Sequence, residues 1–259
     1  VEKPPGPSDA RHEALARRLV QTVKLMSEVK VVRRWQANPP VSRPAVQPTV
    51  QKVEKAPVSQ PSSTSRIQTP QIVAIGVSTG GPPVLRTILN LLGTGFPLPI
   101  LIVQHISPGF LQSMVEWLIQ TTGFPTRIAL SGEKPRPGYA YFAPDDSHLV
   151  VQGTRDAARL VLSPAPPECN LRPAVAPLFR SVANSYGAGA IGILLTGMGK
   201  DGAPELKLLR EAGAVTIAQD KDSSVVHGMP GEAIALNAAR YVLPPEAIAE
   251  KLLQLAISR

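Results

Sequence analysis

Three residues have the types needed for nucleophilic acyl transfer, and each follows an apolar, strand-like run. Ser78 lies in a Gly-x-Ser-x-Gly pattern over residues 76–80, and His105 and Asp201 follow later runs. A serine hydroxyl becomes an effective nucleophile when a hydrogen-bonded imidazole accepts its proton, and a carboxylate fixes the tautomer of that imidazole. The sequence therefore predicts a triad of Ser78, His105 and Asp201, provided that the three strand ends meet.

Backbone and side-chain groups beside these residues are predicted to complete the site. Backbone N–H groups in the glycine-containing turns would hold the oxyanion of a tetrahedral intermediate; the candidates are Thr79, Gly80, Gly81, Met198 and Gly199. Side chains near the same strand ends are predicted to line a substrate groove; these are Gln104, Phe110, Arg172 and Met229. Acyl transfer of this kind uses no metal, and we expect neither a metal site nor a cofactor.

Each residue of the predicted triad also has a structural interpretation. Ser78 could be a turn or capping residue, His105 a structural histidine and Asp201 a helix cap. The turn at 78–81 could instead cradle a phosphate or nucleotide at a helix N-terminus. Residues 75–85 contain no Lys or Arg, however, and no Walker-type Gly-Lys-Ser/Thr motif follows, which disfavours that function.

The elements that must position these residues alternate regularly from residue 71 onward. Strand-like apolar runs are expected at 72–77, 100–103, 126–130, 190–195 and 214–218. Helical spacing is expected at about 83–92, 109–121, 174–186, 203–212 and 244–257. The alternation predicts an α/β fold, a doubly wound and mostly parallel sheet of about seven strands between two layers of helices. Its strands would end at one common edge, which brings the triad together.

Residues 132–163 interrupt this alternation. Short apolar runs separated by a polar turn predict an antiparallel ribbon inserted between the crossovers, formed by residues 138–143, 149–151 and 160–162.

The N-terminal residues differ in composition from the rest. Residues 1–71 contain 12 Lys and Arg against 5 Asp and Glu, whereas residues 72–259 contain 15 against 14. The nearly neutral remainder also lacks a basic stripe with interleaved aromatic residues, so we expect no nucleic-acid groove. A helix is predicted over about 9–35, and the seven prolines of residues 36–70 predict an extended linker.

Cysteine content and hydropathy indicate the cellular compartment that we expect for this protein. Cys169 is the only cysteine, which excludes an intrachain disulfide. The sequence contains no apolar run of about 18 residues, so we expect a cytoplasmic protein with no membrane insertion.

Four motifs, in this order along the chain, resemble the catalytic domain of the bacterial chemotaxis receptor methylesterase, the CheB family. They are Ile-Gly-Val-Ser-Thr-Gly-Gly at 75–81, Gln-His at 104–105, Leu-Thr-Gly-Met-Gly-Lys-Asp-Gly-Ala at 195–203 and Gly-Met-Pro at 228–230. The resemblance extends over about residues 71–253. It implies that Ser78, His105 and Asp201 form the family's catalytic triad.

The resemblance also implies a reaction and partners. The expected reaction is hydrolysis of glutamate γ-methyl esters, with deamidation of glutamines, on the cytoplasmic helices of methyl-accepting chemoreceptors. Members of the family usually carry a receiver domain, through which a chemotaxis histidine kinase regulates them. Lys3-Pro4 and the helix that follows resemble the end of a receiver. We therefore expect residues 1–35 to be a receiver remnant, 36–70 a linker and 71–259 the catalytic domain.

One motif departs from the family pattern. The chain has Arg-Pro-Ala-Val-Ala at 172–176 where the family usually has Arg-Pro-Ser-Val-Asp. The missing hydroxyl and carboxylate could be capping groups or could shape the groove, so the departure concerns receptor choice or rate and leaves the predicted triad intact. A catalytically weak adaptor of the same fold is the alternative function.

Overall fold

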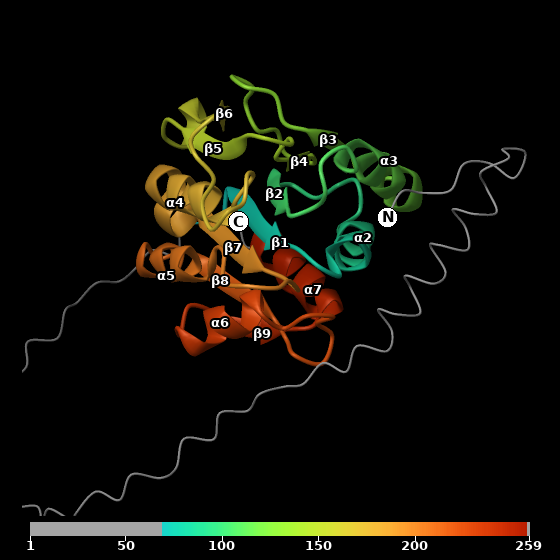
Figure 1. Ribbon diagram of the computed structural model, residues 1–259, viewed down its shortest axis with the longest axis vertical. Helices are drawn as coiled ribbons and strands as arrows, with labels where there is room; N and C mark the ends of the chain where they lie inside the picture. The colour runs from blue at the N-terminus through green and yellow to red at the C-terminus, as the bar shows by residue number, and fades with distance from the viewer. Residues whose placement is uncertain (1–68, 258–259) are drawn as a thin grey trace, which may run out of the picture. The chain divides into compact units, whose positions relative to one another are not determined.

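A single parallel sheet forms the centre of the fold in the computed structural model, which describes residues 69–257 (Figure 1). The predicted helix over 9–35 lies outside the described residues, as does the predicted linker up to residue 68. Within residues 69–257, seven parallel strands pair in the order β3-β4-β2-β1-β7-β8-β9. They are β1 (Ile72–Val77), β2 (Ile100–Gln104), β3 (Thr126–Ile128), β4 (Ala140–Phe142), β7 (Ala190–Leu194), β8 (Val215–Gln219) and β9 (Tyr241–Leu243).

Helices cover both faces of the sheet. On one face lie α2 (Gly81–Leu92), α3 (Leu111–Thr122) and α7 (Pro245–Ile257). On the other lie α4 (Val175–Tyr186), α5 (Ala203–Glu211), α6 (Met229–Ala235) and the antiparallel hairpin of β5 (His148–Gln152) and β6 (Arg159–Ser163). Two short 3-10 helices, η1 (Arg155–Ala157) and η2 (Gly187–Gly189), complete the described elements.

The two faces follow from the side-chain alternation of the strands. In β1, Val73, Ile75 and Val77 pack with the α2, α3 and α7 layer, whereas Ile72 and Ala74 pack with the α4 and α5 layer. Because β1 is buried on both sides, it reads in the sequence as a continuous apolar run. The predicted three-layer α/β fold is confirmed.

The inserted ribbon is smaller than we predicted. Residues 140–142 do not join it; as β4, they pair in parallel with β2 and β3 inside the main sheet. All three are fully buried, and the alternation of a three-residue strand carries too little information to separate the two arrangements. The antiparallel ribbon is the β5–β6 hairpin alone. The short elements α6 and β9 were not predicted, for the same reason of length.

The direction of the strand connections changes at β1. From β1 the chain runs through α2 on one face to β2, and from β7, on the other side of β1, it runs through α5 on the opposite face to β8. The helices that follow β1 and β7 therefore lie on opposite faces of the sheet, and open α/β sheets bind ligands at the carboxyl edge beside such a point. No helix within residues 69–257 is long and apolar enough to cross a membrane.

Candidate active site

The turn after β1 holds Ser78 by its backbone. The Ser78 N–H donates to the carbonyl of Thr196 at 3.0 Å, and the Ser78 carbonyl accepts from the Gly81 N–H at 2.9 Å. The side-chain amide of Gln104 also donates to the Ser78 carbonyl, at 3.0 Å. The side-chain Oγ forms no hydrogen bond with any residue in the described range, and Ser78 is half-buried. The hydroxyl is therefore free to meet a substrate.

The loop after β7 passes very close to this turn because it contains Gly197. A Cβ at position 197 would lie 2.7 Å from Ser78 Cβ and 2.5 Å from the sulfur of Met229. No side chain fits there. Glycine thus allows the glycine-rich loop at 197–202 to contact the Ser78 turn directly.

His105 lies beside Ser78 because β1 and β2 are paired. Val77 is paired with Gln104, and the His105 N–H donates to the Val77 carbonyl at 2.9 Å. The next residues along the two strands are Ser78 and His105, and paired strands lie about 4.8 Å apart. The strand register therefore places the two residues side by side, and their side chains form no hydrogen bond with each other.

Asp201 contacts His105 directly. His105 Nε2 lies 2.9 Å from Asp201 Oδ2, and both side chains are largely buried, with exposed fractions of 9% and 2%. The same carboxylate accepts the N–H of Val175 at 2.6 Å and of Ala176 at 3.1 Å, at the start of α4. Because Nε2 faces Asp201, Nδ1 is the ring nitrogen left to face another group.

The predicted oxyanion donors differ in availability. The Gly81 N–H is engaged with the Ser78 carbonyl, so it is not free to bind an oxyanion in this conformation. The N–H groups of Thr79, Gly80, Met198 and Gly199 form no hydrogen bond within the described part of the chain. The Met198 side chain is 78% exposed above the loop.

The predicted groove residues divide into two pairs. Phe110, 63% exposed, and the partly exposed Arg172 lie at the surface. Gln104 and Met229 are buried, at 4% and 0% exposure, so the prediction that they line the groove is corrected. Gln104 donates from its side-chain amide to the carbonyls of both Ser78 and His105, and it therefore supports the site from within.

Thr196 and Gln219 are site residues that the sequence analysis missed. Both are fully buried. The Thr196 hydroxyl donates to the Thr79 carbonyl at 2.9 Å and accepts the Val226 N–H at 3.0 Å, while Gln219 accepts the Thr196 N–H at 2.8 Å. They join the loops after β1, β7 and β8. A polar residue directly after an apolar strand run was the available signal.

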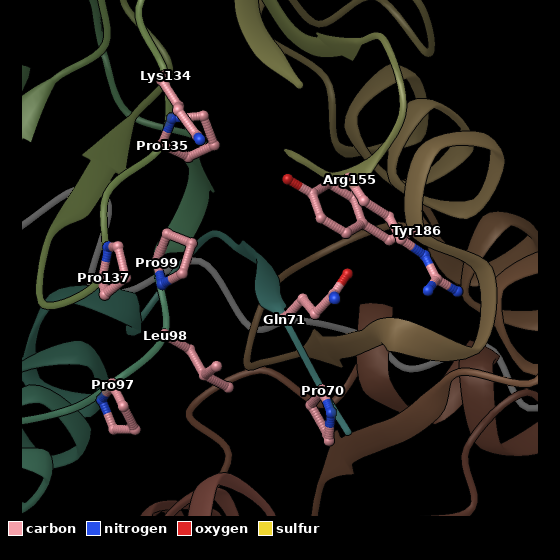
Figure 2. A pocket seen from close by; sticks show the side chains of 10 residues that line it. All are labelled: Pro70, Gln71, Pro97, Leu98, Pro99, Lys134, Pro135, Pro137, Arg155 and Tyr186. Carbon is pink, nitrogen blue, oxygen red and sulfur yellow. The ribbon is translucent and has the colours of Figure 1, made fainter. Parts of the chain in front are cut away.

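The opposite edge of the sheet carries a separate pocket of about 350 Å³ (Figure 2). Its lining includes Gln71, Pro99 and Pro137, which directly precede or lie shortly before β1, β2 and β4. Ser78 lies at the other end of β1, so this pocket is not part of the candidate active site. No group of three or more His, Cys, Asp or Glu within the described residues is arranged to hold a metal ion.

Comparison with known proteins agrees with this fold. The sequence model of the CheB methylesterase family matches residues 73–252. The chain belongs to the CheB methylesterase family. A solved CheB methylesterase catalytic domain, from Thermotoga maritima, superposes with a TM-score of 0.70 at 40% identity and covers 72% of this chain and 98% of that one.

Curated CheB relatives extend the comparison to the whole chain. Protein-glutamate methylesterase/protein-glutamine glutaminase 4 of Geobacter metallireducens is 51% identical over 259 residues, which are 100% of this chain and 70% of the relative. The enzyme of Syntrophus aciditrophicus numbered 1 under the same name is 47% identical, over 95% of this chain and 66% of its own length. The chain thus spans between 66% and 70% of these relatives.

Proposed function

We propose that this protein hydrolyses glutamate γ-methyl esters, and deamidates glutamines, on the cytoplasmic helices of bacterial chemoreceptors. Ser78 is the nucleophile, His105 the general base and Asp201 the residue that orients the imidazole. Membership of the CheB methylesterase family and the names of the relatives support the reaction. The observation that carries the residue assignment is the 2.9 Å contact between His105 Nε2 and Asp201 Oδ2, together with the strand register that makes Ser78 and His105 neighbouring residues.

The contact with Asp201 supports Nδ1 as the His105 nitrogen that acts as the general base. Nε2–H donates to Asp201, so the unprotonated Nδ1 accepts the proton of Ser78. Ser78 Oγ then forms a bond to the ester carbonyl carbon, and the carbonyl oxygen becomes an oxyanion. The free N–H groups of Thr79 and Met198 are placed on the two loops that adjoin Ser78, and we assign them as its donors.

Collapse of this intermediate breaks the bond to the leaving group. His105 Nδ1 returns its proton to the departing oxygen, which leaves as methanol, or to the departing nitrogen of a glutamine, which leaves as ammonia. Water then attacks the acyl-enzyme, giving its proton to His105, and the glutamate is released as Ser78 regains its hydrogen. The sequence of steps consumes one water and needs no cofactor.

The remaining assignments belong to the same proposal. Residues 71–259 form the catalytic domain, residues 36–70 a linker and residues 1–35 the end of a receiver, through which a histidine kinase regulates the enzyme. Because the substrate is the cytoplasmic part of a receptor, the protein acts in the cytoplasm. The start of the family match at residue 73 supports the domain boundary.

The test is methanol release from methylated receptor fragments by the full chain. Ser78→Ala should lower the rate by several orders of magnitude, as expected on removal of a triad member. Ser131→Ala, at an exposed serine outside the site, is the matched control and should retain the wild-type rate. A wild-type rate in Ser78→Ala would refute the assignment of the nucleophile, and an inactive wild-type chain would favour the adaptor.

A further inference from the structure

The mechanism above leaves a second buried histidine unused. His148, the first residue of β5, is 1% exposed, and both of its ring nitrogens have partners. Nδ1 lies 3.1 Å from the Ala174 N–H, and Nε2 lies 3.1 Å from the Pro166 carbonyl. A backbone N–H can only donate, so Nδ1 is the unprotonated nitrogen and Nε2 carries the hydrogen. His148 is therefore fixed in one neutral tautomer.

His148 caps the start of α4, which has no cap of its own. Ala174 stands at the N-cap position and offers no side-chain acceptor. The next two N–H groups, of Val175 and Ala176, donate to the two carboxylate oxygens of Asp201, and Pro177 has no N–H. The backbone donors at this helix start are thus divided between His148 and Asp201.

The start of α4 also packs against the chain next to Ser78 and next to Asp201. A Cβ added at Gly76 would lie 2.5 Å from Val175 Cγ1, and a Cβ added at Gly202 would lie 2.5 Å from the same atom. Gly76 lies two residues before Ser78, and Gly202 directly follows Asp201. Because this packing leaves no free space, a shift of the helix start must be passed to Asp201.

We propose that His148 is a positioning residue that acts on the catalytic centre through the N-terminus of α4. By holding the Ala174 N–H, it fixes the two following N–H groups, which in turn hold the Asp201 carboxylate against His105. Its effect on turnover rests on the function proposed above. Its effect on the geometry of Asp201 does not.

Three variants of the full chain separate the two contacts of the ring. His148→Asn keeps an acceptor at the place of Nδ1, His148→Gln keeps a donor at the place of Nε2, and His148→Phe keeps the ring with neither. His148→Asn should retain kcat within a few fold of wild type. His148→Gln and His148→Phe should each lose about 10- to 100-fold in kcat, with little change in KM, because the misplaced group is Asp201 and not the groove.

A second readout does not depend on activity. With 15N-labelled histidine, of which the chain has 4 residues, NMR reports which His105 nitrogen carries its hydrogen and whether that hydrogen is bonded to a carboxylate. We expect the Nε2–H tautomer in wild type and His148→Asn, and its loss or averaging in the other two variants. Leu252→Ala, which removes a buried side chain from the opposite face of the sheet, should lower stability but leave the His105 signal unchanged.

The outcomes distinguish the proposals. The inference is overturned if a folded His148→Gln or His148→Phe keeps the wild-type His105 signal, or if His148→Gln retains kcat while His148→Asn loses it. Should His148→Phe fail to fold, the Asn and Gln variants decide. A wild-type chain without esterase activity whose His105 signal still changes in His148→Gln would refute the proposed function and support the positioning role.

Discussion

Gly197→Ala should slow the reaction by displacing the nucleophile. The added Cβ would lie 2.7 Å from Ser78 Cβ and 2.5 Å from Met229 Sδ. Atoms in van der Waals contact lie about 3.5–4.0 Å apart, so the loop and the Ser78 turn must separate by about 1 Å. Met229 is fully buried and Ser78 Cβ belongs to a backbone held by three hydrogen bonds, so neither moves freely.

The expected magnitude follows from that displacement. Overpacking of this kind destabilises a protein by about 1–3 kcal/mol. A displacement of about 1 Å at a reacting atom lowers kcat by about 100-fold. Methanol release from methylated receptor fragments gives kcat and KM, and urea unfolding of the same preparations gives the free energy of unfolding.

Gly192→Ala is the matched control for this prediction. Its Cβ would lie 2.7 Å from Leu209 Cδ1 and 2.9 Å from Leu206 Cδ1, in the middle of β7 and away from Ser78. It should lower the free energy of unfolding without lowering kcat. If Gly197→Ala retains the wild-type kcat, or if Gly192→Ala loses as much, the close approach of the two loops is not what positions Ser78.

Two further predictions concern buried polar side chains. Gln104→Leu leaves the His105 carbonyl without its amide donor and removes one of two donors from the Ser78 carbonyl. It should destabilise the protein by about 1–3 kcal/mol and lower kcat about 10-fold. An unchanged kcat in the assay of methanol release would show that Gln104 does not hold Ser78 and His105 in position. Burial raises the pKa of the Tyr141 hydroxyl above its ordinary value of 10.0, so the folded state favours the protonated phenol. The stabilisation is complete below about pH 10 and is lost as the pH rises through the folded-state pKa. Urea unfolding across this range should show a steeper decline for wild type than for Tyr141→Phe, and equal slopes would contradict the burial of this hydroxyl.

The sequence was sufficient to predict five of the seven strands of the sheet, all except β4 and β9. Parallel strands bury both faces and end at one edge, so an apolar run followed by a polar residue indicates both a strand and a site residue. Ser78 and His105 follow adjacent strands, and pairing in register makes them neighbours.

Contacts between distant segments could not be predicted in the same way. Asp201 accepts hydrogen bonds from the backbone of Val175 and Ala176 because α4 and the loop after β7 pack together. Backbone N–H groups are the same in every residue but proline, so the sequence does not indicate that contact. Gln104 was predicted to line the substrate groove, whereas it is buried and its side-chain amide donates to two carbonyls. The helix start at 174–176 has no side-chain cap of its own, and its backbone N–H groups donate to His148 and Asp201.

The central claim is that Ser78, His105 and Asp201 act as one unit, and the double variant Ser78→Ala/Asp201→Asn tests it most directly. Residues of a single catalytic unit give strongly non-additive losses. The rate of methanol release by the double variant should therefore be no lower than that of Ser78→Ala alone, although Asp201→Asn by itself should lose about 10⁴-fold. A double variant whose loss equals the product of the two single losses would contradict the triad.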